Sequence, residues 1–385
     1  MKLIKISVIV IMCVLFISAF SFVGCSSTTT AAAETTGTVV TTAAAETTVA
    51  ATTNAAATTT TGKKWKILFV AKLLGHPYEA RQQKAVEAAA KDFNMDITFT
   101  GPMKADALDQ VKIIEDWLAK GIDGLVVSPD DPAALNPVMK KAMSMGVKVG
   151  YYESNADPGT YDYGFTPVDD KQYGEHLWDL MVHYMDLQKN STGPGTGDYI
   201  ILTGGLQANN LNNWIKFGTE MSATKYPQLK LLADKIPTDE QQQLAYEKAL
   251  EVITAYPTMH AIMGQSSPTG PGAAQAIREK GKQNEIALVA TSLPNQCKDF
   301  LKDGSIDCAS LYDPGVITYV AAYGFKLWLE GTDISKGFTS LVGPEGAKSI
   351  TTAKKEVTIG GSDGKTFVVG DPLDWTNDNV NNYDF

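Results

Sequence analysis

A short apolar segment, KILFV at residues 66–70, is followed by apolar side chains at helical spacing from Pro77 to Asp92. The first pattern is typical of a strand buried on both faces, and the second of a helix that covers one face. The same pair of patterns recurs along the chain. It predicts strands at 96–99, 124–128 and 147–152 and helices at 105–120 and 133–145.

The pattern begins again in the second half of the chain. Strands are predicted at 199–202, 230–232, 261–263 and 286–289, separated by helices near 213–226, 240–255 and 271–281. Apolar strands that alternate with helices indicate a parallel sheet covered on both faces. About 320 residues follow position 62, which is more than one hydrophobic core usually serves. The predicted fold is therefore α/β, with two doubly wound parallel-sheet lobes.

The first 25 residues carry the signals of an export leader. A basic start with Lys2 and Lys5 precedes an uncharged apolar run over 6–23, which is typical of a secretory signal peptide. The run approaches the roughly 20 residues that span a bilayer, so a retained membrane anchor is the alternative. Phe-Val-Gly-Cys at 22–25 resembles the lipobox of bacterial lipoproteins, which implies a signal peptide over 1–24 and a lipid on Cys25. We expect an extracytoplasmic chain that this lipid anchors to the cell membrane.

Residues 25–62 are mostly Thr and Ala, and Glu34 and Glu46 are their only charged residues. Such a segment lacks the large apolar side chains that offset the entropy of ordering. An Ala-rich helix is the alternative, but the many β-branched Thr residues disfavour it. We expect a disordered tether between the lipid and the folded part.

Composition and motifs exclude several classes of function. The net charge of −10 falls to −12 without Lys2 and Lys5, which argues against a nucleic-acid partner. The sequence lacks Gly-x-x-x-x-Gly-Lys-Ser and His-Glu-x-x-His motifs. Its adjacent carboxylates at 130–131 and 169–170 point in different directions and make poor metal pairs. We predict that the protein is not an enzyme and uses no catalytic residue, cofactor or metal.

Two cysteines, Cys297 and Cys308, are the only thiols of the predicted folded part. Outside the cell such a pair can form a disulfide, and a separation of eleven residues fits a helix-turn-strand corner. Two reduced, buried cysteines are the alternative. The sequence alone leaves both possibilities open.

Polar side chains gather where the predicted strands end. Ligands of open α/β sheets bind at the carboxyl ends of the strands, and two such lobes facing each other form a cleft. Charged, amide and hydroxyl groups with a few aromatic rings suit a sugar. The predicted ligand-binding residues are Lys72, His76, Tyr78, Asp130, Glu153, Asn155, Asn210, Asn213, Trp214, Gln265, Ser267, Ser292 and Asp313.

Several stretches also resemble a known family. They are residues 70–75, 109–111, 121–128, 273–276 and 377–385. From Lys66 to Phe385 the chain resembles the type I periplasmic binding proteins of ABC sugar importers, and it is similar to their autoinducer-2-binding and rhamnose-binding branch. The resemblance implies a hinge that closes around a ligand and a closed form that docks on a membrane permease.

The family's hinge has three segments. The resemblance places them near 166–168, near 311–313 and before the last strand. It implies an N-terminal lobe of 63–166 with 312–345 and a C-terminal lobe of 167–311 with 346–385.

The resemblance also bears on the ligand. Lys72 matches a lysine that contacts ligand in the autoinducer-2 proteins, whereas Glu153 replaces an aspartate. Asn210-Leu211 replaces an aspartate-glutamine pair, and Gln265 and Ser267 replace a proline and an alanine. The added amide and hydroxyl groups favour a neutral monosaccharide or polyol, such as a pentose or deoxyhexose, over autoinducer-2.

We therefore predict a monomeric solute-binding lipoprotein that delivers a monosaccharide or polyol to an ABC permease. An autoinducer-2-type signal-binding protein, or a sugar sensor that presents its ligand to a receptor, is the alternative. A glycoside hydrolase would need two carboxylates roughly 5–10 Å apart, for which Glu153 with Asp130 or Asp313 is the candidate pair.

Overall fold

The computed structural model describes residues 63–341, 354–360 and 364–385. The predicted signal peptide, Cys25 and the tether lie outside the described residues. Within the described part, no helix has the length and apolar character needed to cross a membrane.

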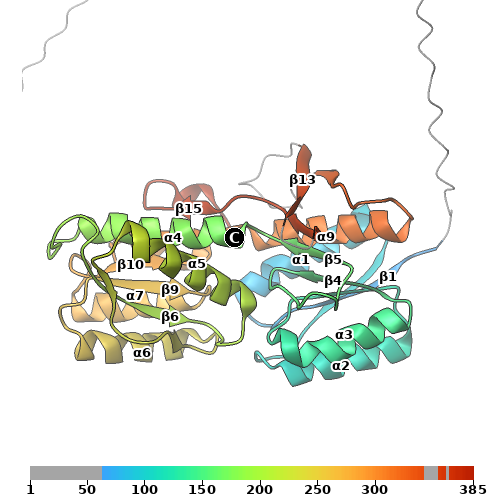
Figure 1. The fold of residues 1–385 in the computed structure, drawn as a ribbon, viewed down its shortest axis with the longest axis horizontal. Helices are drawn as coiled ribbons and strands as arrows, with labels where there is room; N and C mark the ends of the chain where they lie inside the picture. Colours follow the sequence, from blue (N-terminus) through green and yellow to red (C-terminus); the bar gives the residue numbers. More distant parts are fainter. Residues whose placement is uncertain (1–62, 342–353, 361–363) are drawn as a thin grey trace, which may run out of the picture. The chain divides into compact units, whose positions relative to one another are not determined.

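The first lobe is built on a mostly parallel sheet with the strand order β12-β13-β14-β5-β4-β3-β1-β2 (Figure 1). Its strands are β1 (Lys66–Val70), β2 (Asp96–Thr100), β3 (Gly124–Val127), β4 (Lys148–Tyr152), β5 (Tyr163–Thr166), β12 (Phe338–Leu341), β13 (Lys354–Gly360) and β14 (Thr366–Val368). Its helices are α1 (Pro77–Asp92), α2 (Ala107–Lys120), α3 (Pro132–Ser144) and α9 (Pro314–Leu329).

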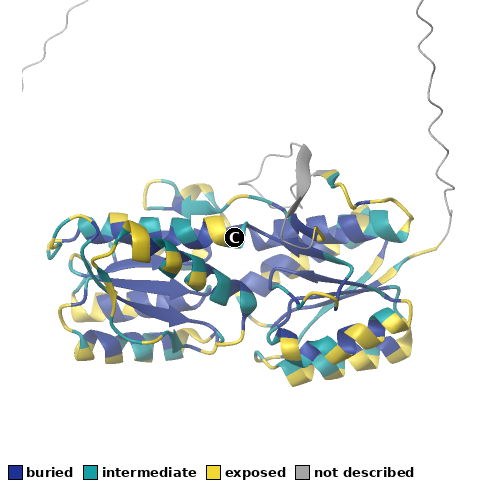
Figure 2. Cartoon of the chain, in the orientation of Figure 1, coloured by how far each residue is buried: buried dark blue, intermediate teal, exposed yellow. Residues whose placement is uncertain are grey.

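Successive side chains of β1 enter two different cores. Ile67 and Phe69 pack with α1 and α9, whereas Leu68 and Val70 pack with α2 and α3. All four side chains are at most 2% exposed. Figure 2 shows the same buried strands between helices whose outer faces are exposed. The apolar run therefore arises because helices cover both faces of the sheet, as its pattern predicted.

The second lobe repeats this design with the strand order β15-β11-β10-β9-β6-β7. Its strands are β6 (Gly197–Thr203), β7 (Leu229–Leu231), β8 (Ile236–Pro237), β9 (Ala261–Gln265), β10 (Ala287–Ala290), β11 (Cys308–Leu311) and β15 (Leu373–Trp375). Its helices are α4 (Asp170–Asp186), α5 (Asn209–Lys225), α6 (Gln242–Ala255), α7 (Thr269–Lys280), α8 (Pro294–Lys302) and the 3-10 turn η1 (Val380–Asn382). The predicted α/β fold with two parallel-dominated sheets is confirmed.

The sequence-based prediction gave no range for several elements, among them β5, α4 and α9. The helix α9 lacks a visible apolar stripe because it is apolar nearly all round, and eleven of its sixteen residues are buried. The helix α4 begins at the adjacent carboxylates 169–170, which were predicted to be poor metal ligands. Asp169 Oδ1 accepts a hydrogen bond from the backbone N–H of Gln172 at 2.8 Å. Asp169 is therefore an N-cap.

The chain passes between the two sheets three times, after β5, after β11 and after β14. The first and third segments lie side by side, because Val369 N–H donates to the carbonyl of Thr166 at 2.9 Å and Gly370 N–H to that of Pro167 at 3.0 Å. The three-segment hinge that the resemblance implied is therefore present.

The predicted limits of the lobes need one correction. Residues 346–385 were assigned to the second lobe, but β13 and β14 extend the first sheet. Phe367 of β14 pairs with Phe165 of β5, and their rings stack with centroids 5.1 Å apart. This buried aromatic packing holds β14 in the first lobe, so the last passage occurs only before β15.

The two cysteines are free, and both are buried in the core of the second lobe. Cys297 lies on α8, and Cys308 begins β11, where its thiol contacts the carbonyl of Ala309 at 3.7 Å. The possible disulfide is therefore not formed, and the reduced alternative holds.

Both thiols should be labelled when the purified protein is alkylated under denaturing, non-reducing conditions. Burial raises the pKa of Cys297 to about 12 and that of Cys308 well above its usual range, so little reactive thiolate exists in the folded chain. Peptide mass spectrometry locates the label. A cross-linked peptide that contains both cysteines would contradict this expectation.

Candidate functional site

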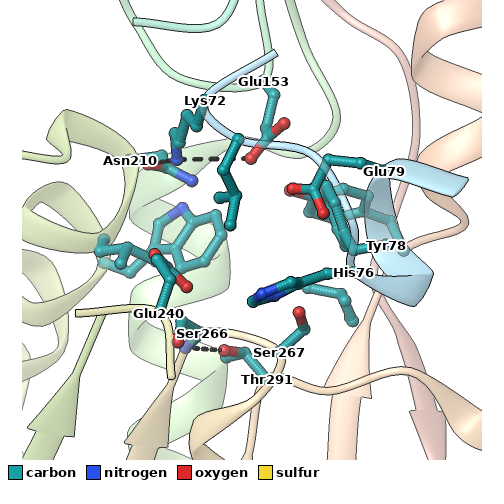
Figure 3. Close-up of a pocket in the computed structure, with 15 residues that line it drawn as sticks. Lys72, His76, Tyr78, Glu79, Glu153, Asn210, Glu240, Ser266, Ser267 and Thr291 are labelled. Carbon is teal, nitrogen blue, oxygen red and sulfur yellow. Dashed lines mark hydrogen bonds and ion pairs between the residues drawn. The ribbon is translucent and has the colours of Figure 1, made fainter. Parts of the chain in front are cut away.

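A pocket lies between the two lobes, at the carboxyl ends of strands from both sheets (Figure 3). The space between its walls is about 440 Å³, including the part that opens to solvent. It is lined by Lys72, Leu73, His76, Tyr78, Glu79, Glu153, Asn210, Leu211, Trp214, Glu240, Ser266, Ser267, Thr291, Leu311 and Tyr312.

Lys72 follows β1 and connects the lobes. Its Nζ lies 3.3 Å from Glu153 Oε1 in the first lobe and donates to Asn210 Oδ1 in the second at 3.1 Å. Its side chain is only 6% exposed. Burial lowers the pKa of Lys72, but the carboxylates of Glu153 and Glu240 outweigh this effect and hold the pKa above its usual value. Lys72 is therefore a buried cation.

Glu153 directly follows β4 and is held in a restricted conformation. Its φ of 64° lies in the left-handed region, which side chains other than glycine rarely adopt. Besides Lys72, its carboxylate accepts a hydrogen bond from Gln82 Nε2 at 3.0 Å. The conformation directs the carboxylate between α1 and the pocket, and strain of this kind often marks a functional site.

Two further carboxyl groups in the pocket, Glu79 and Glu240, were missed by the sequence analysis. Glu79 lies in the first turn of α1, and its Oε2 has no hydrogen-bond partner among the described residues. Glu240 follows the two-residue strand β8 with a φ of 56° and bonds to the hydroxyl of Ser266. Burial raises the pKa of both groups, that of Glu79 most strongly. No sequence signal indicated Glu240, because β8 is too short to recognise.

An aromatic wall closes the side of the pocket next to the hinge. Tyr78 of α1 donates its hydroxyl hydrogen to the Tyr312 hydroxyl at 2.9 Å, and the two rings meet edge to face. Burial raises the pKa of both phenols well above the usual value. Trp214 of α5 and Leu311 of β11 extend this surface. The wall offers the apolar surface on which a sugar ring can pack.

Hydroxyl-bearing loops form the wall contributed by the second lobe. Ser266 directly follows β9 with a φ of 116°, and its N–H donates to Thr291 Oγ1 at 2.6 Å. Ser292 Oγ donates to the carbonyl of Ser267 at 2.7 Å. Ser292 therefore supports the loop that carries Ser267.

Residues 67–333 match the periplasmic binding protein domain family. The chain belongs to this family. Membership confirms the family predicted from the sequence and implies a location outside the cytoplasm. A curated relative, the D-allose-binding periplasmic protein of Escherichia coli K12, is 24% identical over 279 residues, which cover 69% of this chain and 84% of the relative.

Two solved structures share the fold of this periplasmic binding protein. LsrB from Clostridium saccharobutylicum in complex with AI-2 has a TM-score of 0.75 at 21% identity and covers 83% of this chain and 100% of that one. An ABC transporter solute-binding protein from Clostridium phytofermentas with bound L-rhamnose has a TM-score of 0.74 at 20% identity, covering 83% and 97%. At these identities the likeness shows the fold alone.

Seven of the predicted ligand-binding residues line the pocket of this periplasmic binding protein. They are Lys72, His76, Tyr78, Glu153, Asn210, Trp214 and Ser267. Gln265 lies behind the wall, fully buried, and neither of its amide atoms has a partner among the described residues. Asp130 lies outside the lining but acts on Lys72 through its charge. A ligand-binding role for these residues stays a prediction.

Asn155 and Asn213 instead line a neighbouring groove around Asp170. Asp170 Oδ2 accepts from Asn213 Nδ2 at 2.8 Å and from Asn155 Nδ2, across the lobes, at 3.3 Å. Trp214 Nε1 donates to the other oxygen at 2.7 Å. Burial raises the pKa of Asp170 to about 6 despite these bonds. Asp170 therefore orients the Trp214 ring that faces the pocket.

Asp313 forms an ion pair at the hinge. Its oxygens accept from Arg81 Nε at 2.9 Å and Arg81 Nη2 at 2.6 Å, and Oδ1 also caps α9 by accepting from Gly315 N–H at 2.8 Å. The Arg81 guanidinium carbon lies 5.2 Å from the ring centroid of Phe385. The pair joins α1, α9 and the end of the chain.

No group of three or more His, Cys, Asp or Glu residues suited to a metal ion occurs in the described ranges.

Arg81→Ala should lower the free energy of unfolding by about 3–5 kcal/mol, because it leaves Asp313 as an unpaired buried charge. Urea unfolding followed by circular dichroism measures this. Arg278→Ala is the matched control, since it breaks an ion pair with Asp303 that is more than one-third exposed, and it should cost no more than about 1 kcal/mol. Equal losses in both variants would contradict a special role for the buried pair.

Proposed function

We propose that this periplasmic binding protein captures a monosaccharide or polyol between its lobes and delivers it, as a monomer, to an ABC permease. The observation that carries the proposal is the pocket itself. Both lobes contribute buried polar groups to it, and the hinge side contributes an aromatic wall. A sugar presents outward hydroxyls and an apolar ring face, which match these two kinds of surface.

The pocket supports a closing mechanism. Lys72 and Glu153 belong to the first lobe, and Asn210, Glu240 and Ser266 to the second. A ligand bonded to both sets stabilises the arrangement in which the lobes meet, because only that arrangement satisfies all of its groups. The three hinge segments allow this motion without disrupting either sheet. The closed form would be the one that the permease recognises.

The names of similar proteins support this class of ligand. The curated relative from E. coli is named for D-allose, and one structural neighbour holds L-rhamnose. The chain covers most of the length of both, 84% and 97%. A lipid on Cys25 would hold the protein at the outer face of the cell membrane, where such a ligand arrives.

Titration calorimetry tests the function directly. We expect at least one aldose, deoxyhexose or polyol, or an amino derivative of one, to bind with a dissociation constant of about 1 μM or lower. Autoinducer-2 should bind weakly or not at all, because buried amides and hydroxyls left unpaired cost about 1–3 kcal/mol each. Tight binding of autoinducer-2 with no response to any sugar or polyol would contradict the proposal.

Lys72→Ala should weaken binding of the ligand found in that screen at least tenfold, or about 1.4 kcal/mol. The ammonium lies in the pocket and can donate to several ligand oxygens. Circular dichroism and the melting temperature check that the variant folds. Lys216→Ala, which removes an exposed lysine from α5, should leave the dissociation constant unchanged. An unchanged affinity in Lys72→Ala would remove this lysine from the site.

A further inference from the structure

The pocket holds more negative than positive groups. Three of its lining residues, Glu79, Glu153 and Glu240, carry carboxyl groups, and Lys72 is the one lysine or arginine among the lining residues. His76 also lines the pocket, but burial lowers its pKa, so it adds no compensating charge near neutral pH. The carboxyls of Glu79 and Glu240 therefore lack a dedicated cation.

The charge of Lys72 is already engaged. Its Nζ lies 3.3 Å from Glu153 and donates to Asn210. Its positive charge lowers the pKa of Glu79 and that of Glu240, but burial raises both pKa values by more. The pocket therefore holds two acidic groups, Glu79 and Glu240, in addition to the ion pair of Lys72 with Glu153.

Glu79 shows most clearly what the pocket lacks. Its residue is 8% exposed, and its Oε2 is buried without a hydrogen-bond partner among the described residues. A buried carboxyl oxygen costs free energy unless it accepts a hydrogen bond. In Figure 3 its carboxyl group faces the pocket from one side and that of Glu240 from another. The two groups come from different lobes, on α1 and on the loop after β8.

A protonated amine on the ligand would supply both a positive charge and hydrogen-bond donors to these two carboxyl groups. It carries one positive charge and three hydrogen-bond donors, whereas a sugar hydroxyl carries no charge and one donor. Charge-assisted bonds between an ammonium and a carboxylate are roughly twice as strong as those between neutral groups. A neutral ligand would leave two carboxyls either protonated or uncompensated in a buried site.

We propose that the ligand of this pocket carries a protonated amino group on its polyhydroxylated frame, as an amino sugar or amino polyol, and that Glu79 and Glu240 hold this group. The inference rests on the proposed function and replaces the neutral ligand that the sequence alone indicated. Lys72, Asn210 and the hydroxyls of Ser266 and Ser267 remain for the oxygens of the ligand.

Matched pairs of probes distinguish an amino ligand from a neutral sugar or polyol. Titration calorimetry on the purified full-length protein compares D-glucosamine with D-glucose, D-galactosamine with D-galactose, and 1-amino-1-deoxy-D-sorbitol with D-sorbitol at pH 7. The members of each pair differ by one amine in place of one hydroxyl. We expect the amine of at least one pair to bind tenfold or more tighter than its neutral partner.

Carboxamide variants locate the charge. Glu79→Gln and Glu240→Gln keep the shape of the side chain, and each should reduce the ratio of amine to neutral affinity at least tenfold. Glu87→Gln is the matched control, because Glu87 is an exposed residue of the same helix as Glu79 and bonds only to Gln83 among the described contacts. The ratio in this control should equal that of the unchanged protein.

The outcomes are distinct. If the neutral members bind as tightly as the amines or tighter, the inference is overturned and sugar capture stands. If no member of any pair binds, both the inference and the proposed function are overturned for these ligands. An amine preference that survives in both glutamine variants would overturn the assignment to Glu79 and Glu240. If a variant fails to fold, the comparison of amine and neutral probes on the unchanged protein still tests whether the ligand carries an amino group.

Discussion

Burial of parallel strands on both faces is the constraint on which the rest of the structure depends. It forces helices onto each side of both sheets and gathers the carboxyl ends of the strands along one edge. In the first lobe, Lys72 follows β1 and Glu153 follows β4 at that edge. In the second lobe, Ser266 follows β9 and Thr291 follows β10. The pocket forms where the two edges meet.

The charged groups at this meeting point are costly to bury, and the structure compensates them unevenly. Lys72 with Glu153, and Arg81 with Asp313, are buried pairs in which each charge has a partner. Asp313 also caps a helix, so its pairing fixes the start of α9 at the hinge. Neither Glu79 nor Glu240 forms an ion pair with any other described residue. Because an unpaired buried charge is unfavourable, this difference is the basis for the proposal that Glu79 and Glu240 hold a charged group of the ligand.

The hinge accounts for how two rigid lobes can share one site. Backbone hydrogen bonds join the first and third segments through Thr166 and Val369, while Tyr312 in the second segment bonds to Tyr78 of α1. Tyr312 therefore belongs to both the pocket wall and the hinge. Movement of the lobes about these segments would shift Tyr312 against Tyr78, which couples the shape of the pocket to the angle between the lobes.

The sequence by itself determined the repeated strand and helix pattern, the two lobes, and the position of Lys72 and Glu153 at strand ends. These features depend on local periodicity and on the residues that follow a strand, and both are visible in a single chain. The family resemblance added the hinge, since no periodic pattern marks where the chain passes between sheets.

Only the tertiary structure decided which polar groups share the pocket. The sequence analysis did not single out Glu79, and Glu240 followed a strand too short to detect, yet packing of the two lobes places both in the same pocket as Lys72. Asp313 was predicted as a ligand contact, and only the structure shows that Arg81, 232 residues earlier in the chain, pairs with it. Such pairings join residues far apart in sequence. They depend on how buried faces fit together, which is a property of the packed molecule and leaves no local signal in the chain.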